Sequence, residues 1–153
     1  MDVNRRHLMG ASAAGFAGAL AMSPEPLRAA PLTSTLGRDA TQYGVKPGNP
    51  DDQTRALQRA VDEAARAQVP LALPPGVYRT GMLRLQNGSQ LIGVRGATKL
   101  VFTGGASMFL GEGAARIGLA GITLDGGSIP LPQRRGLVHC LGGRDVCIVD
   151  CDI

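Results

Sequence analysis

The chain has 153 residues, which leaves room for one domain, and it combines 22 glycines with only 3% aromatic residues. Its 16 lysines and arginines against 12 aspartates and glutamates give a formal net charge of +4. The basic residues are scattered and aromatic side chains are scarce, which argues against a nucleic-acid-binding protein. No apolar run approaches the roughly 20 residues that a membrane-spanning helix needs.

The N-terminal segment, residues 1–29, has the pattern of an export signal. Arg5 and Arg6 precede a weakly apolar segment, residues 8–22, that is rich in alanine and glycine and too short to span a bilayer. The paired arginines and the leucine that follows resemble the twin-arginine export motif. This resemblance implies a bacterial protein that the Tat machinery exports to the periplasm or the medium, with cleavage after Ala29. The alternatives are an N-terminal anchor and a disordered, alanine-rich tail.

Residues 30–39 are expected to be a linker, and an amphipathic helix is expected over about residues 52–68. Asp51 or Asp52 can cap its first turn, because a short carboxylate accepts hydrogen bonds from free backbone amides. Pro70 ends it, since proline has no amide to donate. Apolar residues recur at helical spacing on one face, at Leu57, Ala60, Val61 and Ala64.

After Pro70 the pattern changes to short apolar stretches separated by glycine-rich corners, such as "MLRL", "KLVF" and "GITL". Strands this short and evenly spaced indicate an all-β fold. A coarse repeat of about 20 to 25 residues favours a β-solenoid. A sandwich or jelly roll is the alternative, but it more often uses longer strands joined by hairpins such as Asn-Gly. Asn87-Gly88 is the one such pair, and we interpret it as a solenoid corner.

The stretch "LALPPGVYRTGMLRL" contains the most specific corner. Pro74 and Pro75 favour extended backbone angles and offer no amide to a strand ladder. Gly76 permits a turn that a residue with a Cβ atom resists. The stretch therefore predicts a strand, a corner and a second strand, with Tyr78 filling the space at the end of the stack.

These features together resemble the pectate-lyase-like superfamily of right-handed parallel β-helices. The resemblance lies in "YGVKPGNPDD", the helix that follows it, and the "PPGVY" corner. The "GITLDG" region and the residues after it, in a chain that begins with a twin-arginine signal, more closely resemble a subgroup of exported repeat proteins of unassigned function. The resemblance implies a parallel β-helix over residues 40–153, with coils over about 71–153 and the helix as an N-terminal cap. The chain stops within an expected strand, so we expect the native protein to continue beyond Ile153.

The same resemblance implies an acidic polysaccharide or a cell-envelope glycan as the partner. Lyases of the superfamily use calcium and a basic residue, and its hydrolases use paired carboxylates. The alternatives are a non-catalytic envelope scaffold or glycan-binding protein, and an inactive fragment. No catalytic constellation is identifiable in the sequence.

Four residues are weak candidates for a substrate site. Asp125 in "LDGG" can bind calcium or a sugar, although a turn aspartate that bonds its own backbone is the favoured interpretation. Arg134 and Arg135 can grip a uronate carboxylate, but solvation in a proline-rich loop is favoured. His139 can act as an acid or base, although an outward-facing or satisfied core histidine is favoured.

The three cysteines Cys140, Cys147 and Cys151 are an odd number for an exported protein. One disulfide between neighbouring coils is an alternative, as is a zinc site that only His139 can complete. We favour small core residues buried in the coils.

Overall fold

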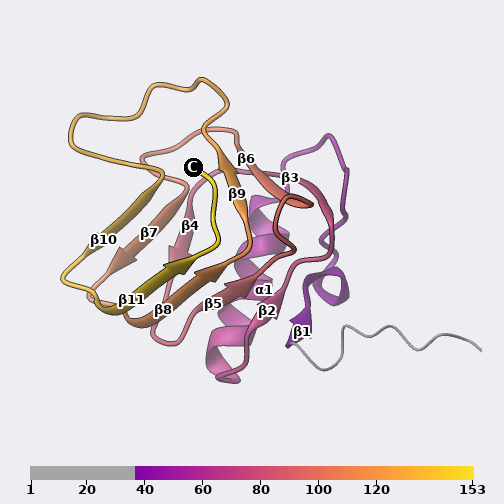
Figure 1. The fold of residues 1–153 in the computed structure, drawn as a ribbon, viewed down its shortest axis with the longest axis horizontal. Helices are drawn as coiled ribbons and strands as arrows, with labels where there is room; N and C mark the ends of the chain where they lie inside the picture. Colours follow the sequence, from indigo (N-terminus) through magenta and orange to yellow (C-terminus); the bar gives the residue numbers. More distant parts are fainter. Residues whose placement is uncertain (1–36) are drawn as a thin grey trace, which may run out of the picture. The chain divides into compact units, whose positions relative to one another are not determined.

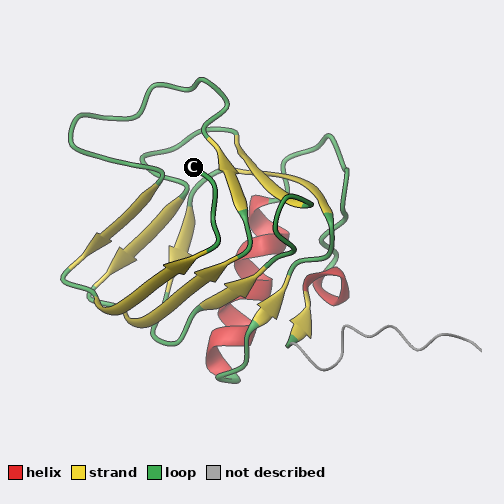
Figure 2. Ribbon diagram, viewed as in Figure 1, coloured by secondary structure: helices red, strands yellow, loops and turns green. Residues whose placement is uncertain are grey.

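The computed structural model describes residues 37–153, so the predicted signal with Arg5 and Arg6 lies outside the described residues. This part of the chain consists mainly of short strands, packed beside the helix α1 (Thr54–Arg66) (Figures 1 and 2). A short 3-10 helix, η2 (Ala40–Tyr43), precedes α1. None of the described helices is long and apolar enough to cross a membrane.

The strands form three sheets, which we name A, B and C. In spatial order, sheet A contains β1 (Arg38–Asp39), β2 (Leu71–Ala72), β5 (Gln90–Ile92), β8 (Ala115–Ala120) and β11 (Arg144–Val149). Sheet B contains β3 (Gly76–Thr80), β6 (Thr98–Phe102) and β9 (Thr123–Asp125). Sheet C contains β10 (Val138–Leu141), β7 (Phe109–Glu112) and β4 (Leu83–Leu85).

The chain visits the three sheets in turn. Strands β2, β3 and β4 form the first coil, β5, β6 and β7 the second, and β8, β9 and β10 the third, after which β11 returns to sheet A. All strand pairs between successive coils are parallel. The fold is therefore a parallel β-helix, as the sequence predicts (Figure 1).

The later coils are longer than the repeat that the sequence predicts. The equivalent positions in sheet A are Leu71, Leu91, Leu119 and Ile148, so the first step lies within the predicted repeat and the next two exceed it. Much of the extra length lies in the corners that lead into sheet C, where residues 103–108 precede β7 and residues 126–137 precede β10. The strands of successive coils therefore stay in register, and the additional residues lie in the corners between them.

The core is a stack of side chains that point inward from alternate strand positions. In sheet B, Tyr78, Leu100 and Leu124 occupy equivalent positions on successive coils and are all buried. The Pro-Pro-Gly corner makes the first of these layers. Gly76 has a φ of 151°, and a Cβ atom there would lie 2.5 Å from the Cβ of Pro47. The Tyr78 hydroxyl closes the corner by donating to the carbonyl of Pro74 at 2.7 Å.

The first coil would leave three strand edges without backbone partners, and residues 38–58 supply partners for all three. Strand β1 pairs with β2 in sheet A, although it lies inside the predicted linker 30–39. In sheet B, the amides of Gly48 and Gln53 donate to carbonyls of β3 at 2.9 and 2.8 Å. In sheet C, the side chain of Gln58 on α1 both donates to and accepts from the backbone of Arg84.

Helix α1 is shorter at both ends than the predicted 52–68. The N-cap residue is Gln53 and not the predicted Asp51 or Asp52, and its side chain forms no capping hydrogen bond. Asp52 lies one residue earlier, and its carboxylate accepts a hydrogen bond from the amide of Thr54 at 3.0 Å. Gln68 has a left-handed φ of 54°, which is incompatible with a continuing helix before Pro70. The buried face of the helix belongs to the same core as the coils and consists of Leu57, Ala60, Val61 and Ala64.

We predict that Leu57→Asp lowers the free energy of unfolding by about 3 to 5 kcal/mol, because it places an unpaired charge in the core. Denaturant unfolding followed by circular dichroism measures this loss. The matched control is Ala67→Asp at the exposed C-cap of the helix, where the added charge opposes only the helix dipole and lowers the stability by about 1 kcal/mol or less. Wild-type stability of the Leu57 variant would show that α1 does not close the core.

Candidate functional site

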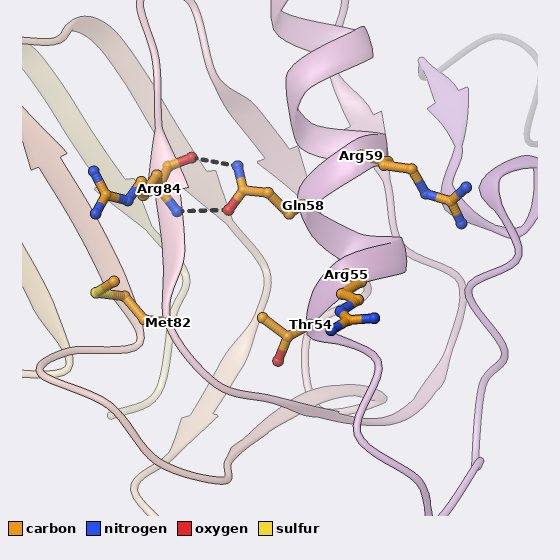
Figure 3. Close-up of a pocket in the computed structure, with 6 residues that line it drawn as sticks. All are labelled: Thr54, Arg55, Gln58, Arg59, Met82 and Arg84. Atoms are coloured by element: carbon orange, nitrogen blue, oxygen red, sulfur yellow. Dashed lines mark hydrogen bonds between the residues drawn. The ribbon is translucent and has the colours of Figure 1, made fainter.

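A groove lies between α1 and β4, beside the outer face of sheet C. Its volume is about 700 Å³. Six residues line it, four from α1 and two from the start of sheet C: Thr54, Arg55, Gln58, Arg59, Met82 and Arg84 (Figure 3). The lining contains three guanidinium groups and no carboxylate, so the groove favours anions.

The floor of the groove is held rigidly by Gln58. Its amide nitrogen donates to the carbonyl of Arg84 at 2.9 Å, and its amide oxygen accepts from the amide of Arg84 at 2.8 Å (Figure 3). The side-chain amide therefore substitutes for a neighbouring strand on the open edge of β4. Thr54 makes a similar contact, because its hydroxyl accepts from the amide of Gly81 at 2.6 Å.

The three arginines are spread along the groove. Arg84 and Arg59 point to opposite sides of Gln58 (Figure 3). Arg55 lies one turn before Arg59, about 6 Å along the helix axis. Among the described residues none of the three forms a salt bridge, since the ion pairs there are Arg66–Glu63, Arg95–Asp150 and Lys99–Asp125. Separated and unpaired cations suit an extended anion with repeated charges better than a small one.

The groove continues onto the outer face of sheet C. The register places Arg84, Leu110 and His139 side by side on β4, β7 and β10. Their neighbours Leu83, Phe109 and Val138 are the inward-facing positions, so this row points outward. Strand spacing puts the backbone of His139 roughly 10 Å from that of Arg84.

Two further residues define this outer face. Leu110 is only 7% exposed and forms an apolar floor between Arg84 and His139. A smaller hollow of about 200 Å³ lies over Leu110 and is lined by Arg84 at one side and Glu112 at the other. Glu112 is exposed and lies two residues beyond Leu110 on β7, so it also points outward. His139 and Glu112 are the groups on this face that can exchange protons.

The long corner 126–137 leads directly into β10 and carries Arg134 and Arg135. Arg134 is exposed and has a left-handed φ of 63°. The corner is anchored at its end, where the carbonyl of Leu137 accepts from the amide of Phe109 at 2.8 Å. Arg134 and Arg135 thus lie in the corner that precedes β10, whereas His139 lies on β10 itself.

Asp125 lies apart from these residues, on the outer face of sheet B. Its Oδ2 atom pairs with Lys99 Nζ at 2.6 Å, and its Oδ1 atom accepts from the amide of Gly127 at 2.8 Å. The hydrogen bond from Lys99, and then the one from Gly127, hold the pKa of Asp125 below its ordinary value. The favoured interpretation of a turn aspartate is confirmed, with an ion pair added that the sequence did not indicate.

The cysteines do not form the buried set that we favoured. All three are free thiols, and Cys147 is exposed. It lies on β11, whose six residues are all exposed and which pairs with β8 among the described strands. Cys140 and Cys151 are partly buried and pack against the core.

The calcium ion that the fold resemblance implies finds no fitting set among residues 37–153. Calcium takes six to eight oxygen ligands, of which carboxylates are the main protein contribution. No group of three histidine, cysteine, aspartate or glutamate side chains gathers within the described part of the chain. The chemistry proposed below therefore uses no step through a metal.

Sequence reasoning missed Arg55, Arg59, Arg84 and Glu112. Arg55 and Arg59 had a signal, since their spacing of four residues puts them on one face of a helix. The sequence signal for Arg84 was weaker: it is the polar residue between two leucines of a strand, which marks it only as facing outward. The groove itself had no signal, because it depends on how α1 packs against β4.

We predict that Lys99→Met raises the pKa of Asp125 toward its ordinary value of 3.8. The attraction in the wild type is present above that value and is lost as the pH falls through the lowered pKa. A carboxyl-carbon NMR titration measures the midpoint, and Arg95→Met, which removes a different exposed ion pair, is the control. An unchanged midpoint in the Lys99 variant would show that the pair is absent in solution.

The sequence matches no protein-family model and no curated protein. Among solved structures, the chain is similar to the A-module of mannuronan C-5 epimerase AlgE4 of Azotobacter vinelandii, with a TM-score of 0.59 and 22% identity. The A-module of AlgE6 of the same organism gives 0.58 and 23%. In each case 74% of this chain is covered, but only 37% and 36% of the epimerase modules. The chain thus spans little more than a third of these modules, and the likeness confirms the parallel β-helix fold.

Proposed function

We propose that this β-helix protein binds an acidic polysaccharide along the outer face of sheet C and the groove beside α1. The observation that carries the proposal is that Arg55, Arg59 and Arg84 all line one open groove and form no salt bridge among the described residues. The Arg59 guanidinium itself is turned toward the far side of α1, where it donates to the carbonyl of Tyr43. Guanidinium groups bind carboxylates through paired hydrogen bonds, and a polyuronate presents a carboxylate on every sugar. The fold supports this, because the similar epimerase modules are named for their action on mannuronan.

The chemistry that fits the face is removal of a proton next to a uronate carboxylate. An arginine beside the carboxylate stabilises the negative charge that develops there. His139 or Glu112 accepts the proton. Departure of the neighbouring glycosidic oxygen, which takes up a proton from the second of these groups or from water, then gives a lyase product. Return of a proton from that second group to the opposite face of the ring instead gives an epimer.

A non-catalytic glycan-binding protein is the second candidate. The described outer face supplies cations and two proton-exchanging groups, but His139 and Glu112 lie on different strands, and the structure records no hydrogen bond between them. A binding protein needs only the arginines and the groove. The two candidates differ in their products, since only the enzyme changes the polymer.

We predict that Arg84→Gln weakens binding of polymannuronate roughly three- to fivefold, the loss of one exposed charge-assisted contact. Isothermal titration calorimetry measures the affinity, with a neutral glucan as the negative ligand. Arg144→Gln is the matched control, because Arg144 is an exposed arginine on sheet A, outside the groove. Equal affinity of both variants and wild type would contradict the proposed surface.

The product assay uses the same polymer. The ultraviolet absorbance of a new double bond reports a lyase, and a change in the proton NMR spectrum of the sugar C5 position reports an epimerase. Loss of either signal in His139→Ala or Glu112→Gln, with binding retained, assigns the proton acceptor. Binding without either signal favours the non-catalytic candidate.

Export through the twin-arginine route also stays a proposal, supported by Arg5, Arg6 and the weakly apolar segment after them. We predict that replacing both arginines by lysine leaves the precursor in the cytoplasm of its native cell. Fractionation followed by immunoblotting measures the distribution, and Arg28→Lys is the control. Unchanged export of the double variant would contradict this route.

A further inference from the structure

A second polar cavity lies on the other side of α1 from sheet C. Its volume is about 560 Å³, and it is formed by residues 44–53 and the first turns of the helix. It shares Arg55 and Arg59 with the groove beside β4. In turn that groove shares Arg84 with the hollow over Leu110. The three concavities therefore follow one another from the second coil, across the first coil, to the N-terminal segment.

The second cavity has a different chemical lining from the groove. Lys46 adds a third cation to the two shared arginines, and Asn49, Asp51 and Asp52 add amide and carboxylate groups. Asp52 is committed to the fold, because its two oxygens accept from Thr54 and from the Thr103 hydroxyl at 2.6 Å. Asp51 is exposed, and the structure records no hydrogen bond to its side chain.

This combination matches a carboxylated sugar. Cations suit the carboxylate, and an acceptor such as Asp51 suits the hydroxyl groups of the ring. Arg59 already points toward this side of the helix, where it donates to the carbonyl of Tyr43 at 3.4 Å. Because that hydrogen bond is long, Arg59 loses little by turning to a carboxylate.

The backbone that presents Lys46 is fixed. Gln53 is buried, and its side chain accepts from the amide of Lys46 at 2.6 Å and donates to the carbonyl of the same residue at 2.9 Å. The Lys46 side chain itself is exposed and has no ion-pair partner among the described residues. Because the backbone is fixed, association has to order only the Lys46 side chain and not the segment that carries it.

We propose that this cavity is an additional subsite, which extends the binding groove past the first coil and takes a uronate-type sugar residue of a long chain. The inference rests on the proposed function of the sheet C face. It adds that the N-terminal helix takes part in binding, and that Lys46 contributes only when the ligand is long enough to cross α1.

The test compares a trisaccharide and a decasaccharide of mannuronate on the full chain by isothermal titration calorimetry. Lys46→Gln weakens binding of the decasaccharide roughly three- to fivefold and leaves the trisaccharide unchanged. Arg84→Gln weakens binding of both. Arg144→Gln, which removes the same charge elsewhere, changes neither. The Lys46 variant is expected to fold normally, because Gln53 binds only the backbone of residue 46.

The outcomes separate the two proposals. If Arg84→Gln weakens binding but Lys46→Gln keeps wild-type affinity for the decasaccharide, the subsite is wrong and the sheet C groove stands. If Lys46→Gln weakens both oligosaccharides equally, a subsite specific to long chains is wrong. If the wild type binds neither, the subsite and the proposed function are both wrong. A loss confined to the decasaccharide supports the subsite.

Discussion

The backbone hydrogen bonds at the start of the solenoid are the constraint on which the rest of this structure depends. A parallel β-helix begins with three strand edges whose amides and carbonyls have no earlier coil to pair with. Here each edge receives a different partner: strand β1, the extended segment around Gly48 and Gln53, and the side chains of α1. In sheet C this partner is the Gln58 side chain, and its hydrogen bonds to β4 also create the candidate site. A side-chain amide, unlike another strand, leaves room for a groove, and the helix that carries Gln58 places Arg55 and Arg59 beside it.

The corners impose the second constraint on the site. In the first coil only residues 81–82 separate β3 from β4, whereas residues 103–108 and 126–137 separate the corresponding strands of the next two coils. Insertions at this edge leave the strand register intact, because the ladder fixes each strand and not the path between strands. The corners that lead into sheet C therefore become longer from coil to coil, while the strands of the sheet stay in regular register. Loops of about twelve residues are uncommon in compact domains unless they contribute to function, and this one carries Arg134 and Arg135.

The sequence predicted those parts of the structure that depend on local rules. Alternating apolar residues with glycine corners indicated the coils, and Pro74-Pro75-Gly76 indicated the first of them. The spacing of Leu57, Val61 and Ala64 indicated the helix. The coil length was wrong because it depends on corner insertions that carry no periodic signal. The row of Arg84, Leu110 and His139 could not be found for the same reason, since each step between its members is longer than the predicted repeat. Asp125 and Lys99 are also separated by a whole coil and form a diagonal pair, since the register sets Lys99 opposite Thr123 and Asp125 opposite Val101.

The distribution of charge decides what kind of ligand the surface can hold. Three arginines that converged on one point would bind a single anion tightly, whereas Arg59 and Arg84 point to opposite sides of Gln58 (Figure 3). Each exposed guanidinium contributes at most about 1 kcal/mol to binding one carboxylate, because water and salt screen the interaction. Useful affinity then requires several such contacts on one covalently linked ligand, so that each contact after the first costs little additional entropy. A polymer with a charge on every unit meets this requirement. The same argument explains how a surface without a deep pocket can still be selective, since a neutral polymer of the same shape gains none of these contacts.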